Sequence, residues 1–299
     1  MPNTNAMHAP ALLEVDPDER IIGYWHNVGR RLSHDWVTLF FLTIVLAVIL
    51  TALFAPWLSP MDPIKSSMAY RMKPPGFRDF ILGTDELGRD MLSRLIWGAR
   101  TSLLMGLVPV AIATTIGGAL GIVAGFVGGR TNTLIMRTMD VFYAFPSVLL
   151  AVAISGTLGG GTRSGLLALT LVFIPSLCRV AESGTTQVRN LDYVDAARAS
   201  GASVFSILRY HVVGNSLGPI LVFSSSLISV SILLGSGLSF LGLGVEPPTP
   251  DWGLMLSTLR SAIYVQPLVC ALPGVAIFVT SVSFNLVSDG LRRAMDIRA

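Results

Sequence analysis

The chain has 299 residues, of which 52% are apolar and only 13% are charged, and its net charge at neutral pH is +3. Soluble domains usually carry about 25% charged residues, so this composition argues against a soluble protein and indicates a membrane protein. The net charge is too small and too evenly spread to indicate a nucleic-acid partner.

The N-terminal part of the chain precedes the first long apolar run. Residues 1–19 are polar, contain three prolines and are predicted to form a flexible cytoplasmic tail; no basic region precedes a short apolar core, which argues against a cleaved signal peptide. From Arg20 to Leu32, apolar residues recur at helical spacing and include Trp25. This pattern favours a helix that lies in the membrane interface, and a solvated linker is the alternative.

Long runs without charge mark the predicted membrane spans. Five runs reach the ~20 residues needed to cross the hydrocarbon core. They lie between Asp35 and Asp62, Arg100 and Arg130, Asp140 and Arg163, Arg209 and Glu246, and Arg260 and Asp289. A sixth, less apolar span is predicted from about Gly165 to Ser183, where Arg179 and Glu182 are expected to pair at the membrane boundary. The runs do not alternate between apolar and polar residues, so we expect an all-α membrane protein with six transmembrane helices.

Basic residues in the short connections predict the orientation of these spans. Connections on one side of the membrane carry Arg30, Arg31, Arg130, Arg137, Arg189, Arg198, Arg209, Arg292, Arg293 and Arg298. This side is predicted to be the cytoplasm, with both termini on it. The external segment 59–100 opposes the rule because it also carries seven basic residues, although five acidic residues partly offset them.

Small residues and prolines within the spans predict how the helices pack. Gly117, Gly121 and Gly125 recur at intervals of four and are expected to let another helix approach closely. Pro146 and Pro175 each free a carbonyl group and are expected to kink a helix.

The cysteines and histidines predict neither a disulfide nor a metal site. Cys178 and Cys270 lie inside apolar runs, where buried free thiols are expected. The four histidines show no spacing that is typical of metal ligands.

Two segments predicted to lie outside the membrane carry polar and aromatic residues. Within residues 82–100, Thr84 or Asp85 is expected to cap an exposed amphipathic helix that leads into the second span. The charged residues spaced to pair along one turn of this helix are Asp85, Glu86, Arg89 and Asp90. Residues 237–253 are predicted to form a glycine-rich helix end and a proline-stiffened turn, with Trp252 at interface depth.

The most informative stretch is the polar segment after the fourth predicted span. Asp192 or Asn190 is expected to cap a helix over about residues 193–200, and Gly201 is expected to end it in the left-handed conformation. Ser203 is predicted to cap a second helix. The residues expected to share one face of that helix are Val204, Ile207, Leu208 and His211. Such short helices bury little on their own, so a partner protein would stabilise them; a helix–turn–helix that merely connects two spans is the alternative.

These segments resemble a family of transport proteins. Asp195-Ala196-Ala197, three residues and Gly201 resemble the Glu-Ala-Ala loop of bacterial ABC importer permeases. Segments 83–90, 145–147, 237–250 and 285–292 are similar to the C-type permease of the dipeptide, oligopeptide and nickel branch, and the resemblance runs from about residue 20 to residue 298. Two positions depart from the family pattern: Asp195 replaces the usual Glu, and Gly214 stands where Pro is usual.

The resemblance implies a MetI-like fold with five core helices, here the second to the sixth span, and one additional N-terminal span. Residues 20–75 would comprise the interfacial helix, the first span and the start of an external loop. Residues 76–299 would form the permease core, with a cytoplasmic coupling helix at about residues 191–213, between the fourth and fifth spans.

The resemblance also implies roles for individual residues. Contact with an ATPase subunit would involve Tyr193, Asp195, Ala196, Ala197, Arg198, Ala199, Gly201 and His211. Docking of a solute-binding protein on the external side would involve Asp85, Glu86, Arg89, Asp90 and Trp252. Asp195 would orient the coupling helix, through hydrogen bonds or a pair with Arg198.

The implied function is that of a permease subunit in an ATP-driven, binding-protein-dependent importer of di- or oligopeptides in the bacterial inner membrane. Its partners would be a homologous B-type permease, two cytoplasmic ATPase subunits, an extracytoplasmic solute-binding protein and the lipid bilayer. The sequence has no phosphate-binding loop of the Gly-x4-Gly-Lys-Ser/Thr type and no defensible catalytic constellation, so ATP and Mg²⁺ are expected on the partner subunits, with no cofactor or metal in this chain.

Three alternatives remain open at this point. The solute could be nickel or another small molecule, because this branch of the family also serves such cargoes. An ion-coupled secondary transporter would need an intramembrane ion site. The candidates for that site, Asp140, Arg179 and Glu182, lie at predicted span ends, where pairing at the interface is the expected role. A membrane scaffold without transport activity would show no dependence on substrate.

Overall fold

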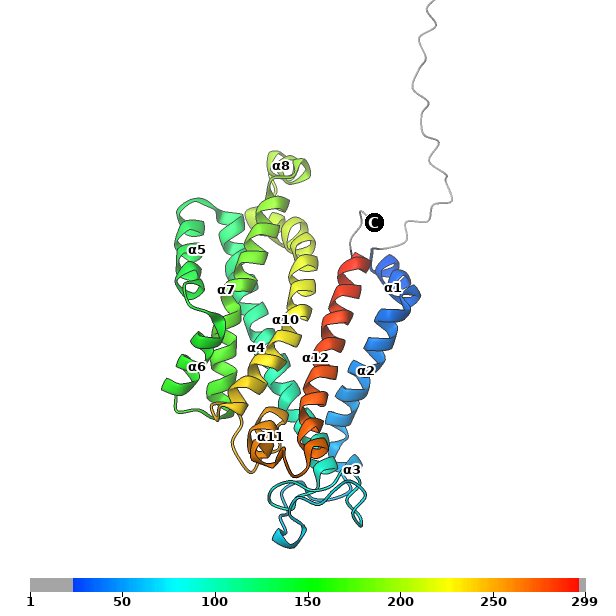
Figure 1. The fold of residues 1–299 in the computed structure, drawn as a ribbon. Coiled ribbons are helices and arrows are strands. Elements are labelled where there is room, and N and C mark those ends of the chain that lie inside the picture. Colours follow the sequence, from blue (N-terminus) through cyan, green and yellow to red (C-terminus); the bar gives the residue numbers. More distant parts are fainter. Residues whose placement is uncertain (1–23, 296–299) are drawn as a thin grey trace, which may run out of the picture.

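The computed structural model describes residues 24–295, and the regular elements in that part of the chain are all helices (Figure 1). Five are long and apolar enough to cross a membrane: α2 (Trp36–Leu53), α4 (Met91–Val127), α7 (Gly161–Arg189), the run Val204–Phe240 that ends in α10 (Gly214–Phe240), and α12 (Pro267–Met295). The bent pair α5 (Gly129–Tyr143) and α6 (Ser147–Thr157) makes a sixth span if it is counted as one. This confirms the all-α membrane fold.

The third predicted span is broken rather than continuous. Helices α5 and α6 meet at an angle of 86°, and Pro146 occupies the N-cap position of α6. Proline has no backbone N–H to continue the hydrogen bonds of α5, which confirms the kink predicted there. Pro175, by contrast, lies inside the unbroken helix α7.

The glycine stripe on α4 packs against α7, as predicted. A Cβ atom added at Gly117 would lie 2.6 Å from the carbonyl oxygen of Ile174, and one at Gly125 would lie 2.6 Å from that of Glu182. Only glycine allows the two backbones to approach this closely, so α4 and α7 form a tightly packed pair.

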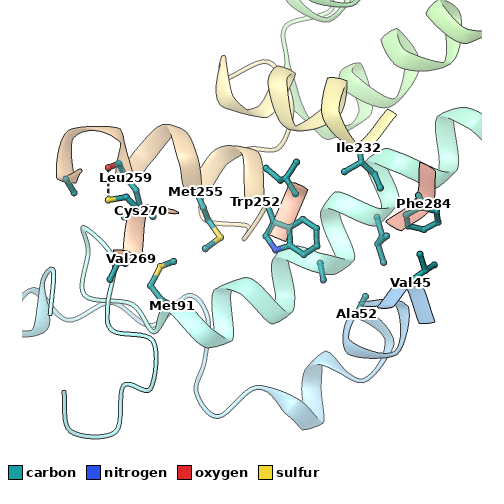
Figure 2. Packing of buried hydrophobic residues seen from close by; sticks show 14 residues of the cluster. Val45, Ala52, Met91, Ile232, Trp252, Met255, Leu259, Val269, Cys270 and Phe284 are labelled. Carbon is teal, nitrogen blue, oxygen red and sulfur yellow. Dashed lines mark hydrogen bonds between the residues drawn. The ribbon is translucent and has the colours of Figure 1, made fainter. Parts of the chain in front are cut away.

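The buried residues form two large apolar clusters on either side of α4 and α10. One joins α2, α4, α10, α11 (Trp252–Leu259) and α12, and Figure 2 shows Trp252 at its centre, between Met255 and Ile232. The other joins α4, α6, α7 and α10 around Leu169 and Leu177. Both cysteines are buried free thiols, as predicted. Cys270 lies in the first cluster and Cys178 lies on α7.

Helix α1 (Tyr24–His34) and the start of α2 pack against the end of α12 (Figure 1). Asp35 caps α2 and its Oδ2 atom lies 2.7 Å from Nη2 of Arg293. Hydrogen bonds from Arg293 and Thr38 hold the pKa of Asp35 well below its usual range. A helix after residue 20 was predicted and is found from Tyr24, whereas the predicted tail 1–19 lies outside the described residues.

The charged residues that join α5 and α7 pair differently from the prediction. Arg179 does not pair with Glu182; its Nη2 donates to Oδ1 of Asp140 on α5, at 2.7 Å. Glu182 Oε1 instead accepts from Nδ2 of Asn132, at 2.6 Å. The prediction considered only α7, and the partners come from α5, which the break at Pro146 places alongside it.

Candidate functional site

Helix α8 (Asp192–Ala199) projects beyond the ends of the long helices (Figure 1). Neither Asn190 nor Asp192 caps it, as had been predicted: Asn190 ends α7, Asp192 is the first helical residue, and Leu191 is the N-cap without a side-chain hydrogen bond. The error arises because α7 runs to Arg189 and leaves only two residues, Asn190 and Leu191, before α8 begins. Asp192 and Asp195 nevertheless lie in the first turn, where negative charge stabilises a helix.

One fully buried side chain attaches α8 to the core. Val194 is fully buried and packs in a small cluster with Ile207 and Val212, and half-buried Phe126 and Val188 border that cluster. These neighbours come from the ends of α4 and α7 and from the segment leading into α10. Sequence reasoning missed Val194, although it is the only aliphatic residue larger than alanine in α8.

The other side chains of α8 remain available to a partner. Asp195, Ala196, Arg198 and Ala199 are exposed, and Ala197 is half-buried. The predicted pair between Asp195 and Arg198 forms, with an N–O distance of 3.1 Å. Since 67% of the Asp195 side chain is exposed, solvent screens this pair, so it orients the two groups more than it stabilises the helix.

Tyr193 and His211 are brought together, as members of the predicted coupling set. Their ring centroids lie 6.0 Å apart. Nδ2 of Asn215 donates both to the Tyr193 hydroxyl, at 3.0 Å, and to the carbonyl oxygen of His211, at 2.7 Å. These contacts tie the start of α8 to the start of α10.

Gly201 ends α8 as predicted. Its φ angle is +78°, the left-handed region that glycine adopts without strain. The amide of Ala202 donates to the carbonyl of Ala197 at 3.1 Å, and the amide of Gly201 donates to that of Arg198 at 3.0 Å. This hydrogen-bond pair is the Schellman motif.

The segment after Gly201 contains a π-helix, which the sequence did not predict. Ser203 caps the short α9 (Val204–Ser206) as expected, and the π-helix η2 (Ile207–Val213) follows. Because residues five apart share a face in a π-helix, Ile207 and Val212 are buried, whereas Val204 is 69% exposed. The predicted shared face was therefore wrong for Val204. Gly214 has helical dihedral angles and continues directly into α10.

Arg189 strengthens the connection between α8 and the long helices. Its Nη1 atom donates to the carbonyl oxygens of Gly125 and Phe126, at 3.1 and 3.0 Å. A cation at the C-terminal end of α4 satisfies carbonyl groups that the helix itself leaves unpaired. Contacts beneath α8 thus join the ends of α4 and α7 and the start of α10.

At the opposite end of the molecule, residues 82–90 form a loop, and the exposed helix predicted from residue 82 is wrong. Helix α4 begins at Met91, with Asp90 rather than Thr84 or Asp85 as its N-cap. The Thr84 hydroxyl instead accepts a hydrogen bond from the amide of Lys73 at 2.8 Å. Thr84 therefore joins distant parts of the loop instead of starting a helix.

The charged residues of this loop pair as predicted but are buried rather than exposed. Asp85 Oδ2 lies 2.6 Å from Nε of Arg89 and 3.2 Å from Nε of Arg94, and Glu86 pairs with Arg89 at 2.9 Å. Asp85 is 1% exposed and Arg89 5%. Buried charges persist only when they are paired, so this cluster holds the shape of the loop. Asp90 is buried too, because its carboxylate caps α4.

Trp252, which was predicted to lie at interface depth, has a buried side chain, and Figure 2 shows it packed among apolar neighbours. Its indole Nε1 donates to the carbonyl oxygen of Leu95 at 3.0 Å, and a Cβ at Gly98 would lie 2.9 Å from its ring. Helix α11 folds back onto α4, which buries the ring.

Asp251, which sequence reasoning missed, secures α11 to α4. Its Oδ1 accepts from the amide of Leu254 at 3.0 Å, and its Oδ2 accepts from Oγ of Ser102 at 2.8 Å. Burial raises the pKa of Asp251. An aspartate directly before Trp252 is a possible helix cap, and that signal was readable in the sequence. Within residues 24–295, no group of three or more His, Cys, Asp or Glu side chains is placed to hold a metal ion.

Comparison with known proteins shows that the chain is similar to membrane components of transport systems. Residues 117–299 match the family described as binding-protein-dependent transport system inner membrane component, and residues 23–75 match the N-terminal TM domain of oligopeptide transport permease C. The chain is 41% identical to the di/tripeptide transport system permease protein DppC of Pseudomonas aeruginosa, over 98% of this chain and 97% of that protein.

Two further similarities concern another named solute and the fold. The chain is 37% identical to the glutathione transport system permease protein GsiD of Pectobacterium atrosepticum, over 96% of this chain and 95% of that protein. A chain of the MetNI methionine ABC transporter in an inward-facing conformation superposes with a TM-score of 0.58 at 17% identity, covering 69% of this chain and 98% of that one.

Proposed function

Because the chain belongs to the binding-protein-dependent inner membrane components of bacterial ABC importers, we propose that it is the permease subunit through which ATP-driven import of di- and oligopeptides proceeds. ATP hydrolysis in such a complex belongs to separate ATPase subunits. The ion-coupled secondary transporter and the scaffold without transport activity do not fit a permease of this family.

The proposal rests on the way in which α8 is exposed on one face and attached to the long helices on the other. Its exposed face of small residues can enter a groove on a partner, while Val194 and Arg189 tie it to the ends of three spans. The contact set we propose for the ATPase comprises Tyr193, Asp195, Ala196, Ala197, Arg198, Ala199, Gly201 and His211. Of these, Tyr193 and His211 also brace α8 against α10.

The proposed mechanism follows from the contacts that join α8 to the ends of α4, α7 and α10. ATP binding would bring two ATPase subunits together, and α8 would move with the subunit that holds it. Coupling requires that the contact between α8 and the ATPase differ in free energy between the inward-open and outward-open states. The contacts beneath α8 would convert that difference into a rearrangement of the spans.

We further propose the arrangement of partners. The described end of α1 and the end of α12 lie at the α8 end of the molecule (Figure 1), which supports an inner-membrane orientation with both termini cytoplasmic. A homologous B-type permease and two ATPases, carrying ATP and Mg²⁺, would complete the complex. The solute-binding protein would dock at the α11 end, on a loop whose shape Asp85, Arg89 and Asp90 maintain from within.

Peptides are the favoured solute because the named solutes of DppC and GsiD, a di/tripeptide and glutathione, share amide bonds and charged ends. Nickel remains the alternative within the branch. The test is reconstitution of the chain with its partner permease, ATPases and binding protein in liposomes. We expect trialanine to stimulate ATP hydrolysis and to accumulate only with ATP. Accumulation of nickel without accumulation of peptide would overturn the peptide assignment.

A further inference from the structure

The break between α5 and α6 lies at a depth where lipid cannot surround it. Phe145 and Ser147, beside the break, line a cavity together with Val172 and Ser176 of α7. Val172 and Ser176 lie about 17 and 23 Å from the first residue of α7, at about 1.5 Å per residue. Helix α7 has 29 residues and is about 42 Å long, so the break lies beside its middle, and a hydrocarbon core about 30 Å thick that is centred on α7 contains the break.

This break is also exposed. Phe145 is 57% and Leu149 63% exposed, and Ala144, Pro146 and Ser147 are exposed as well. Helix α6 begins without a side-chain cap, which leaves its first amide groups unpaired. Irregular backbone at membrane depth is tolerated only against protein or a water-filled cavity. The α5–α6 face is therefore not a lipid surface.

Charged and polar groups gather on the same face. The Asp140–Arg179 pair is half exposed, with 44% of the Asp140 side chain and 51% of the Arg179 side chain open. The Arg179 guanidinium lies 4.6 Å from the centroid of the Tyr143 ring, and the Tyr143 hydroxyl donates to Oγ of Ser176 at 2.9 Å. Arg137 approaches the other oxygen of Asp140 at 3.8 Å. Arg179 lies about 27 Å from the first residue of α7, on the α8 side of the break, and an open ion pair on a membrane-spanning helix is typical of a solute path.

The adjoining cavity is slightly smaller than a usual small-molecule site. Its volume is about 250 Å³, and its lining includes Tyr143 and Ser176 of the polar cluster. Complete small-molecule sites usually enclose about 300–1,000 Å³. A second, facing permease subunit would supply the missing wall.

We propose that the α5–α6 face lines the translocation path and that Asp140 and Arg179 contact the charged ends of a zwitterionic, peptide-like solute. The carboxylate of Asp140 would accept from the solute ammonium group, and the guanidinium of Arg179 would donate to the solute carboxylate. The two residues exchange one ion pair within the chain for two with the solute, so neither charge is left unpaired. This inference rests on the proposed function, since it assumes a peptide-like cargo.

Thiol labelling tests whether water reaches the α5–α6 face. In the complete complex in inside-out vesicles, Ala144→Cys and Phe278→Cys would be treated with a membrane-impermeant charged thiol reagent. Phe278 is 66% exposed on α12, outside the α5–α6 face, and serves as the control. The native thiols are buried, and the unsubstituted complex measures their background. We expect Ala144→Cys to react at least tenfold faster than Phe278→Cys. Equal rates would overturn the inference and would indicate lipid or a dry contact between permeases.

Transport of trialanine tests the role of the charges. Asp140→Asn should lower trialanine uptake per ATP hydrolysed at least tenfold. Asp35→Asn is the matched control, since it breaks the Asp35–Arg293 pair, which has the same 2.7 Å separation but lies outside the face. Unchanged uptake per ATP in Asp140→Asn, or an equal loss in Asp35→Asn, would contradict the role.

The two arms separate this inference from the proposed function. If the unsubstituted complex takes up no trialanine, the proposed function fails, and the labelling comparison still decides whether the face is wet. If the unsubstituted complex transports trialanine and Ala144→Cys stays unlabelled, only the inference fails.

Discussion

Substitution of Val194 by alanine tests whether one buried side chain holds α8 in place. Val194 has no solvent exposure and is the only buried residue of α8. Removal of its two methyl groups, at about 0.8 kcal/mol per buried carbon with a further cavity cost, should destabilise the docked helix by about 2 kcal/mol. An eight-residue helix has almost no stability of its own, so this loss should raise the undocked population about thirtyfold.

Amide hydrogen exchange measured by mass spectrometry reports that population directly. In Val194→Ala, exchange over residues 192–199 should accelerate about thirtyfold, and peptide uptake per ATP should fall with it. Val275→Ala is the matched control, because Val275 is 55% exposed on α12 and its truncation opens no cavity beneath α8. Unaltered exchange over residues 192–199 in Val194→Ala would refute the anchoring role of Val194.

Three further substitutions test other parts of the structure. Gly201→Val forces a β-branched residue into φ +78° and should lower peptide-stimulated ATP turnover while basal turnover persists. Asparagine tolerates this backbone region, so Gly201→Asn should keep most of the peptide-stimulated turnover. In thermal unfolding, Gly121→Ala should cost about 1–3 kcal/mol because its Cβ meets the backbone of α7, while Gly118→Ala, with its nearest atom 3.9 Å away, should not. Burial raises the pKa of Asp251, so the free energy of unfolding should decline as pH rises from about 3.9 through the raised pKa. Unfolding measured from acidic to neutral pH should show this decline in the unsubstituted protein and not in Asp251→Asn.

Local patterns in the sequence were sufficient to predict the features that neighbouring residues determine. The long apolar runs predicted the spans, Pro146 the kink, and Gly201 and Ser203 the turn after α8. In each case the physical cause lies within a few residues: a missing N–H group, a left-handed backbone or a capping hydroxyl. The glycine stripe on α4 belongs with them, because its spacing alone specifies one helical face.

Features that depend on distant residues were not predictable in this way. Ser102 and Asp251 are 149 positions apart in the sequence, and only the folded chain shows that their hydrogen bond secures α11 to α4. The charges of the 82–90 loop were expected on the surface because paired burial depends on the loop folding over them. The π-helix of η2 shifts the buried face by one residue, which a period of 3.6 cannot show.

The central claim is that α8 is the point at which an ATPase subunit acts on this permease. The direct measurement places a photo-crosslinking amino acid at Ala196, which is exposed on α8, in the complete complex, with the same substitution at Val275 as control. Mass spectrometry of the adducts should show Ala196 joined to an ATPase subunit and Val275 not joined to one. A complex that hydrolyses ATP in response to peptide but yields no adduct between position 196 and an ATPase would contradict the claim.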